Sequence, residues 1–380
     1  MLRVVQVLGT TGLGGAESRV MDIYRHINRK EIQFDFLVTA GTKGHYEKEI
    51  ESLGGRIYYL PAFRVYNIVK YRNACKAFFK ARRGDYVAVH GHMTSTASIY
   101  LPIAKKAGVP LTIAHARSAG VDPGIKGTIT RILRKKLYKK CDLMLSCSNE
   151  ASQAVFGAKL VPDKNGKTKA VSDGKEVIFM PNAIDTKAFA FDEETRTEIR
   201  KKYNINDKFV VGHVGSFRYA KNHSRILDIF AKAKEQSSKP MVLMLLGEGE
   251  LMAEMQEKVK ELGIVDSVMF LGNINPVSPY YQAFDVLLFP SHYEGMPGTV
   301  VEAQAAGLPC LVSENITKQA KITEIVTYMS LDEPTQKWAE TLLALGNRDR
   351  HRADKDMANT FYDVNEQVKY YSKLYSGENE

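Results

Sequence analysis

The chain has 380 residues, of which 44% are hydrophobic and 25% charged, and its formal net charge is +10. This length predicts two domains of about 150 to 200 residues each, and the composition excludes a disordered or fibrous protein. The cysteines, Cys75, Cys141, Cys147 and Cys310, fit neither a disulfide framework nor a zinc pattern. No signal peptide or membrane span is indicated, so we expect a cytoplasmic protein. The positive charge is compatible with nucleic acid, an anionic membrane or anionic small substrates.

Strand-like runs alternate with helix-length stretches through most of the chain. The first series lies at 3–8, 34–40, 56–61, 86–92, 110–116, 142–148 and 176–182. After the polar stretch 192–208, a second series lies at 208–216, 240–249, 268–273, 286–291 and 309–314. Such alternation is typical of parallel βα units. The sequence therefore predicts an α/β protein with two doubly wound, Rossmann-like domains, a boundary near Asp185 and a cleft between the strand ends.

Two polar segments of the first domain have distinct patterns. Segment 127–142 combines an apolar stripe with a dense cationic face on a helical period. It fits either an interfacial helix on anionic lipid or a solvated basic helix whose apolar side packs in the core. Segment 157–176 is polar and rich in Gly and Lys, which predicts a mobile surface loop.

Glycine-rich turns follow several of the predicted strands. The first, GTTGLGGAE at 9–17, allows a ligand to approach the backbone at a helix start, but a tight strand-to-helix turn also needs glycine. It matches neither the nicotinamide fingerprint nor a Walker loop. In the second, at 211–230, Arg218 and Lys221 precede a helix that begins near Asn222. Two cations at a helix start predict a diphosphate site, although a solvated loop remains the alternative.

Five motifs, in order, carry a resemblance to a known family. They are GGAE at 14–17, PNAID at 181–185, GSFRYAKNH at 215–223, LGEGEL at 246–251 and DVLLFPSHYEGMPGTVVEAQAAGLP at 285–309. Together they resemble the retaining family-four glycosyltransferases of GT-B fold, and most of all the bacterial capsule and exopolysaccharide transferases of the EpsF group. The seven residues between Glu294 and Glu302 match the Glu-x7-Glu motif of that family.

The resemblance implies a role for each catalytic residue. Glu294 would accept hydrogen bonds from hydroxyls of the transferred sugar, and His115 would lie near that sugar. Arg218 and Lys221 would neutralise the leaving diphosphate. Because charge develops on the departing phosphate in the transition state, fixed cations there lower the barrier, and no metal or other cofactor is expected.

The resemblance also implies the donor site and the division of the chain. Glu302 would bind the nucleotide ribose, and Gly15 would line the donor phosphate and the acceptor side. The complete donor-binding set is Gly14, Gly15, Asn182, Gly215, Gly247, Gly295, Met296, Pro297, Gly298, Thr299 and Glu302. Residues 1–186 with 358–380 would bind the acceptor and residues 187–357 the donor, with the stretch 357–375 crossing back onto the N-terminal domain.

Some positions depart from the family pattern or have another interpretation. Many family members have Arg directly after the strand glycine, where this chain has Ser216, so Arg218 would have to reach the diphosphate from two residues later. His115 is also compatible with a satisfied strand-end histidine. His90 and His92 are more typical of structural residues, and we expect the rings of this His-x-His sequence to point to opposite faces of the strand, which would disfavour a shared metal.

We therefore expect a hexosyltransferase that moves a sugar, with retention, from a UDP-sugar to a lipid-linked or oligosaccharide acceptor during synthesis of capsule, exopolysaccharide or another cell-surface glycan. Its partners would be the donor, the glycan acceptor and an anionic membrane surface bound through 127–142 at the inner face of the cell membrane, but no nucleic acid. The alternatives are a GT-B sugar-nucleotide epimerase, a glycogen-type synthase or phosphorylase, and a non-catalytic nucleotide-sugar-binding protein.

Overall fold

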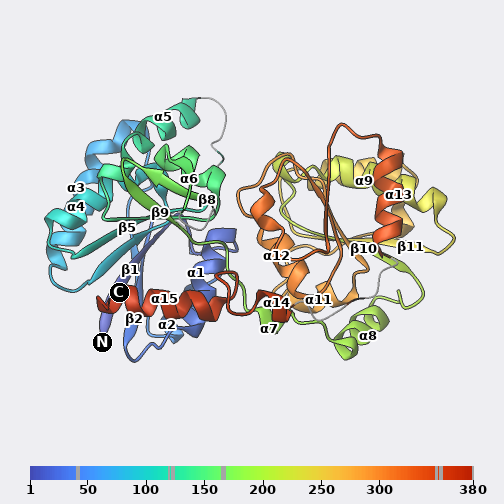
Figure 1. Cartoon of the computed structure of the whole chain (residues 1–380), viewed down its shortest axis with the longest axis horizontal. Helices are drawn as coiled ribbons and strands as arrows, with labels where there is room; N and C mark the ends of the chain where they lie inside the picture. The colour runs from blue at the N-terminus through green and yellow to red at the C-terminus, as the bar shows by residue number, and fades with distance from the viewer. Residues whose placement is uncertain are drawn as a thin grey trace. The chain divides into compact units, whose positions relative to one another are not determined.

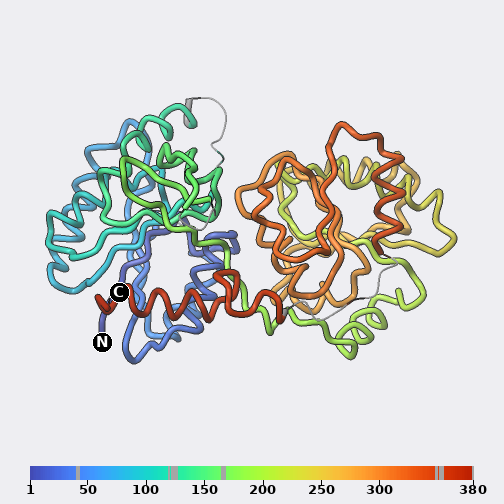
Figure 2. The backbone as a smooth tube through the Cα atoms, viewed as in Figure 1, coloured from blue at the N-terminus to red at the C-terminus, as the bar shows by residue number. Residues whose placement is uncertain are grey.

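The computed structural model describes residues 1–39, 43–118, 120, 125–163, 168–346, 350 and 354–378. The chain forms two compact units, an N-terminal unit of Met1–Ala183 with Val364–Glu380 and a C-terminal unit of Ile184–Asp363. Figure 2 shows the last segment of the chain returning to lie beside the first strands. Residues 184–186 and 358–363, which the family resemblance assigns to the N-terminal domain, belong to the C-terminal unit.

The N-terminal unit is built on a nine-stranded sheet in the order β3-β2-β1-β4-β5-β6-β9-β8-β7. The strands are β1 (Leu2–Leu8), β2 (Ile32–Val38), β3 (Ile57–Tyr59), β4 (Ala88–Gly91), β5 (Leu111–Ala116), β6 (Leu143–Ser146), β7 (Lys159–Pro162), β8 (Thr168–Ser172) and β9 (Lys175–Phe179). The first six strands, paired in parallel, have the 3-2-1-4-5-6 order of a doubly wound sheet. Every residue of β2 is buried, as expected for a parallel strand covered on both faces.

Helices cover both faces of this sheet (Figure 1). They are α1 (Gly15–His26), α2 (Glu47–Ser52), α3 (Ile68–Ala81), α4 (Thr94–Lys106), α5 (Ile125–Arg134), α6 (Asn149–Phe156) and α15 (Val364–Ser376). Helices α3, α4 and α5 pack side by side in one layer, whereas α15 packs on α1 and β1. Local sequence sets the helix ends: the Ser148 side chain accepts a hydrogen bond from the Ala151 amide, and Gly157 ends α6 in the left-handed conformation.

Two sequence expectations about this unit are wrong. Segment 157–176 is not a plain loop, because β7 and β8 within it form an antiparallel extension of the sheet that pairs with β9. Segment 127–142 is not one helix, because α5 ends at Arg134 and Lys136 adopts a left-handed conformation with φ of 59°. After that break, Leu137 is completely buried, so part of the apolar stripe packs in the core.

The C-terminal unit has a six-stranded parallel sheet in the order β12-β11-β10-β13-β14-β15, again doubly wound. Its strands are β10 (Phe209–Val214), β11 (Met241–Leu246), β12 (Val268–Phe270), β13 (Val286–Phe289), β14 (Cys310–Ser313) and β15 (Val326–Met329). Its helices are α7 (Thr186–Phe189), α8 (Glu193–Lys202), α9 (His223–Gln236), α10 (Met252–Glu261), α11 (Ser278–Ala283), α12 (Gly298–Ala305), α13 (Thr335–Gly346) and α14 (Asp354–Met357).

Apolar strand residues hold this unit together. All six residues of β11 are buried, and Trp338 on α13 is completely buried, with its indole N–H donating to the Ser330 carbonyl at 2.9 Å. The α/β architecture with two doubly wound sheets is as predicted. Within the described residues, no helix has both the length and the hydrophobicity that a membrane span requires.

Candidate functional site

The loops that follow β10 and β13 meet at one edge of the C-terminal sheet. Because these two strands are parallel neighbours, their carboxyl ends lie together. The amide of His292 donates to the Ala220 carbonyl at 2.8 Å, and the Asn222 side chain donates to the Pro290 carbonyl at 3.0 Å. The rings of Tyr219 and His292 stack with centroids 4.4 Å apart. These contacts fix the two loops against each other.

Lys221 and Glu294, one from each loop, form an ion pair. Lys221 Nζ lies 2.6 Å from Glu294 Oε1, and the side chains are 16% and 19% exposed. The ammonium also lies 4.6 Å from the centroid of the Phe289 ring, at the end of β13. The structure thus brings together a cation and a carboxylate that retain some access to solvent, so both can contact a ligand.

Arg218 is the second predicted cation of this loop. It precedes a single 3-10 turn, Tyr219–Lys221, and its side chain is exposed. Its guanidinium has no recorded hydrogen bond or ion pair with the part of the chain that the structure describes. Within the described residues, Arg218 is therefore not bonded to the Lys221–Glu294 pair.

Helix α12 carries the second carboxylate. Glu302 is 7% exposed, and its Oε2 accepts a hydrogen bond from the Tyr281 hydroxyl at 2.7 Å. Thr299, in the first turn of the helix, donates to the Val214 carbonyl at 3.0 Å, which ties the helix start to the end of β10. Gly295, Met296 and Pro297, which lead into the helix, are buried. Glu302 is therefore a fixed carboxylate under the same loop as Glu294.

Two glycines at this edge lie close to their neighbours. A Cβ atom at Gly215 would lie 3.0 Å from His213 Nε2 and 3.2 Å from Cδ and Cε of Lys221, so these side chains would have to shift to admit it. Gly247 has φ of +135°, and a Cβ atom there would lie 2.2 Å from the Gly215 carbonyl oxygen. Gly298 begins α12, and a Cβ atom there would approach Glu302 Oε1 to 3.9 Å.

Four predicted site residues, Gly14, Gly15, His115 and Asn182, belong to the N-terminal unit. Gly14 precedes α1 and Gly15 is its first residue. A Cβ atom at Gly15 would meet no heavy atom of the described chain within 4 Å, so internal packing does not explain this glycine. Asn182 accepts a hydrogen bond from Arg117 at 3.2 Å.

His115 belongs to a buried network in which three histidines lie close together. His90 Nε2 and His115 Nδ1 are hydrogen-bonded at 3.0 Å, and His90 Nδ1 lies 2.7 Å from the Tyr375 hydroxyl. His115 has no exposed surface, so contact with a sugar requires this network to move. Burial lowers the pKa of His90, His92 and His115 well below its usual range, and these imidazoles are neutral at pH 7.

The expectation that His90 and His92 point to opposite faces is wrong. Their rings stack with centroids 4.3 Å apart, because residues i and i+2 of a strand face the same side and His92 directly follows the strand end at Gly91. One ligand atom from each of His90, His92 and His115 lies within 4.8 Å of the others. However, Arg117 Nε donates to His92 Nδ1 at 3.2 Å and His92 Nε2 is bonded to Gln6 at 2.9 Å. A neighbouring guanidinium disfavours a metal cation at this position.

Sequence reasoning missed several supporting residues. Tyr281 holds Glu302, Phe289 lies against Lys221, and Tyr375 contacts His90. Only Arg117 had a signal in the sequence, because it directly follows β5 and comes two residues after His115.

The chain matches two family models. Residues 195–326 match "Glycosyl transferases group 1", and residues 14–165 match "Glycosyl transferase 4-like domain". EpsF of Bacillus subtilis, described as a glycosyltransferase, is 31% identical over 98% of this chain and 96% of its own length. The capsular polysaccharide biosynthesis glycosyltransferase CapH of Staphylococcus aureus is 24% identical over 99% of both chains.

A solved structure of HepE from Anabaena in complex with UDP matches the chain with a TM-score of 0.78, at 15% identity and over 99% of this chain and 100% of that one. The two doubly wound units therefore define a glycosyltransferase of GT-B fold. The chain belongs to the family-four glycosyltransferases, among which it resembles the EpsF-type enzymes.

Proposed function

We propose that this glycosyltransferase moves a sugar from a UDP-sugar, with retention of configuration, to a lipid-linked or oligosaccharide acceptor in capsule or exopolysaccharide synthesis. The observation that carries the proposal is the Lys221–Glu294 pair at the strand edge of the C-terminal unit. The capsular role of CapH and the UDP bound to HepE support the glycan class and the nucleotide.

The two side chains can act on the two sides of the bond between sugar and phosphate, which breaks in the reaction. Glu294 can accept hydrogen bonds from sugar hydroxyls, while Lys221 neutralises the β-phosphate as the bond from the anomeric carbon to the phosphate oxygen breaks. The acceptor oxygen forms its bond on the same face of the sugar, and its proton passes to the leaving phosphate. Glu294 is paired with Lys221 and is not assigned as a nucleophile. Glu302, held by Tyr281, is assigned to the ribose hydroxyls.

Gly15 and the residues around it are assigned to the phosphate and acceptor side of the N-terminal unit. The open space beside Gly15 supports this assignment, since a ligand can approach the backbone there. An anionic membrane surface is proposed as a further partner, through the exposed cations Arg131, Lys135, Lys136, Lys139 and Lys140 of segment 127–142.

The test is a panel of nucleotide sugars, each added to the protein while its Tm is recorded. A ligand at 100 times its Kd stabilises the folded state by about 2.7 kcal/mol, so the true donor raises the Tm. Glu302→Ala should reduce that shift, whereas Glu257→Ala, which removes an exposed carboxylate paired with Lys260, should not. Donor-dependent transfer to an acceptor, with the anomeric configuration read by NMR, then tests retention. Product released without acceptor would instead indicate an epimerase.

A further inference from the structure

A single turn of the N-terminal unit exposes four large apolar side chains. Val65, Tyr66, Ile68 and Val69 are 54%, 89%, 38% and 68% exposed. They lie in the 3-10 turn Val65–Asn67 and at the start of α3. Isolated apolar residues are common on protein surfaces, but four within five residues form a contiguous patch. This patch, Val65–Val69, is called the apolar turn below.

The apolar turn is held in place by its own hydrogen bonds. The Asn67 side chain accepts from the Arg64 amide at 2.8 Å and donates to the Ala62 carbonyl at 2.9 Å. The Asn67 amide also donates to the Arg64 carbonyl at 2.9 Å. Beneath the turn, the ring of Phe63 packs edge-on against that of the buried Tyr71. The turn is therefore built to present its apolar side chains outward.

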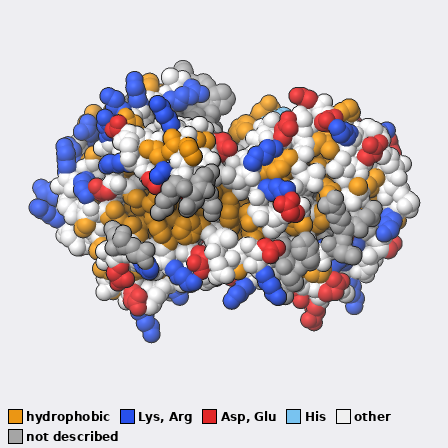
Figure 3. Space-filling model, viewed as in Figure 1, with side chains coloured by type: hydrophobic (Ala, Val, Ile, Leu, Met, Phe, Trp, Pro, Cys, Tyr) orange, Lys and Arg blue, Asp and Glu red, His pale blue; other side chains and the backbone are white. Residues whose placement is uncertain are grey.

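Positive charge surrounds the apolar turn. Between Glu51 and Asp85 the sequence has no acidic residue and eight basic ones: Arg56, Arg64, Lys70, Arg72, Lys76, Lys80, Arg82 and Arg83. The N-terminal unit has 32 Lys and Arg against 17 Asp and Glu, whereas the C-terminal unit has 21 against 26. Figure 3 shows Lys and Arg side chains gathered over the edge formed by α3, α4 and α5. The excess charge of the protein thus resides on the unit that carries the apolar turn.

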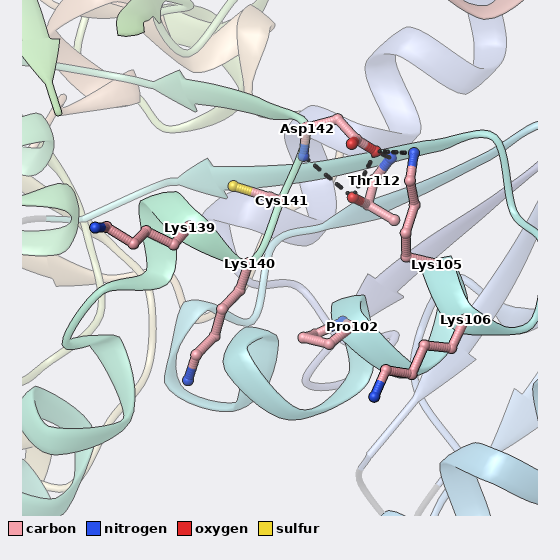
Figure 4. Close-up of a pocket in the computed structure, with 8 residues that line it drawn as sticks. All are labelled: Pro102, Lys105, Lys106, Thr112, Lys139, Lys140, Cys141 and Asp142. Carbon is pink, nitrogen blue, oxygen red and sulfur yellow. Dashed lines mark hydrogen bonds and ion pairs between the residues drawn. The ribbon is translucent and has the colours of Figure 1, made fainter. Parts of the chain in front are cut away.

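A lysine-lined hollow lies at the other end of the same helix layer (Figure 4). Its volume is about 270 Å³, and its lining includes Lys105, Lys106, Lys139 and Lys140. Lys105 is paired with Asp142 at 2.9 Å. Among the described residues, Lys106 and Lys140 form no ion pair with an acidic side chain. In Figure 4 they lie on either side of Pro102. Their ammonium groups can therefore meet an external anion.

Strand direction places these two features at opposite ends of the layer. The apolar turn comes between the carboxyl end of β3 and the start of α3, whereas Lys105 and Lys106 end α4 just before β5 begins. The 14 residues of α3 span about 21 Å, so one partner that contacts both ends must extend along the helices. A broad anionic surface fits this requirement.

We propose that the face formed by α3, α4 and α5 docks on an anionic lipid bilayer, with Val65, Tyr66 and Val69 inserted at the level of the headgroups. Lys106 and Lys140 of the hollow then contact lipid phosphates. Exposed apolar side chains next to cations bind anionic membrane surfaces, and the sequence from 52 to 84 has no acidic residue to oppose this binding. The inserted part is therefore the apolar turn, and segment 127–142 adds charge.

The location of the apolar turn also bears on the acceptor. The turn follows the carboxyl end of β3, at the same edge of the parallel part of the N-terminal sheet at which Gly15 follows β1 and His115 lies near the end of β5. Insertion of the turn would thus bring this edge of the sheet to the lipid surface. A lipid-linked acceptor would then be presented to that edge, and this last step alone rests on the proposed function.

Tyr66→Trp gives a direct test of insertion. The chain has one tryptophan, Trp338, which is buried in the C-terminal unit and supplies a constant background. With vesicles of phosphatidylglycerol and brominated phosphatidylcholine, the fluorescence of the introduced indole should shift to the blue and be quenched. Val265→Trp, at a 54% exposed position of the C-terminal unit, is the matched control and should show neither change. If the protein sediments with the vesicles but the indole at position 66 is not quenched, the apolar turn does not insert and the proposal is wrong.

A second set of variants separates apolar insertion from charge. Combined Val65→Ser, Tyr66→Ser and Val69→Ser should lower partition onto anionic vesicles by roughly 10-fold or more, and the residual binding should disappear in high salt. Combined Lys106→Gln and Lys140→Gln should weaken binding mainly at low salt. Unchanged partition of the triple variant, or equal binding to zwitterionic vesicles, would refute the proposal, and binding only in the presence of another protein would indicate a protein partner instead.

Transfer to a soluble acceptor separates this inference from the proposed function. The triple serine variant should retain that activity, since its substitutions lie outside the proposed catalytic residues. If transfer occurs but vesicle binding fails, only the membrane inference is wrong. If the vesicles bind and no nucleotide sugar supports transfer, only the proposed function is wrong.

Discussion

Lys221 Nζ lies 2.6 Å from Glu294 Oε1, so the cation assigned to the leaving diphosphate and the carboxylate assigned to the sugar are direct partners. Each therefore orients the other before any donor binds. Because the two groups touch, their contributions to catalysis should be coupled and not additive.

Single and double substitutions of this pair test the coupling. Lys221→Ala should lower kcat by roughly 100-fold, because the charge acts mainly as the diphosphate leaves. Glu294→Ala should also lower kcat strongly, with UDP affinity nearly unchanged. The kcat of the double variant should be no more than a few-fold below that of the less active single variant. Full additivity in steady-state kinetics, or normal turnover by Glu294→Ala, would contradict the assigned roles.

Glu302 and Tyr281 should affect donor binding more than turnover. A ribose contact exists in the ground state and the transition state alike, so Glu302→Ala should raise the donor KM by roughly 10-fold or more, with a smaller change in kcat. Tyr281→Phe removes the hydroxyl that donates to Glu302 and should raise KM less. Isothermal titration with UDP checks both effects. An unchanged UDP affinity for Glu302→Ala would assign this carboxylate a structural role only.

Removal of metal ions should leave activity intact. The proposed site supplies positive charge through Lys221, Arg218 and the start of α12, so transfer assayed in excess EDTA should proceed at an unchanged rate. Loss of activity that manganese restores would contradict this prediction. It would direct attention to carboxylates instead, including the single Asp-x-Asp sequence at 354–356.

Stability should fall as the solution becomes acidic. Burial lowers the pKa of His223 to about 4, from an ordinary value of 6.5. Between these pH values the unfolded chain binds a proton that the folded chain does not, so stability decreases as pH falls through this window, by up to about 3 kcal/mol for this residue. Urea unfolding at pH 7, 6, 5 and 4 measures the slope. His223→Gln should reduce it, with the exposed His45→Gln as control. An equal slope in both variants would show that His223 does not cause the effect.

Two glycines with positive φ should respond differently to substitution. Gly247→Ala places a Cβ atom 2.2 Å from the Gly215 carbonyl oxygen, so it should cost at least about 2 kcal/mol and weaken donor binding by moving the backbone beside Lys221. Gly263, with φ of +64° and open space around it, is the control and should cost about 1 kcal/mol on substitution by Ala. Equal losses of Tm would show that close contact with Gly215 does not matter.

The sequence predicted the two doubly wound sheets because long apolar runs separated by helix-length stretches have few other solutions. The sequence alone could not show which of the expected site residues contact one another. Lys221 and Glu294 meet only because β10 and β13 are neighbours, and Tyr375 reaches His90 across 285 residues of sequence.

The errors have local causes. The expectation for His90 and His92 was wrong because residues i and i+2 of a strand face the same side, so their rings lie together at the end of β4. The polar segment 157–176 resembles a loop in sequence because β7 is mostly exposed, both β7 and β8 are short, and such strands lack the continuous apolar run of a fully buried strand.

The route of the chain through its two units has a practical consequence for fragment design. The C-terminal unit is inserted between Ala183 and Val364, and its two ends lie together, with the Ile184 amide donating to the Tyr362 carbonyl at 3.0 Å. Residues 184–363 can therefore be expressed as one uninterrupted piece. The other unit cannot be obtained by simple truncation, because a fragment that stops at 183 lacks the helix against which α1 and β1 pack. Joining residue 183 to residue 364 with a short linker would preserve that helix. An affinity tag would then be placed after the end of α15.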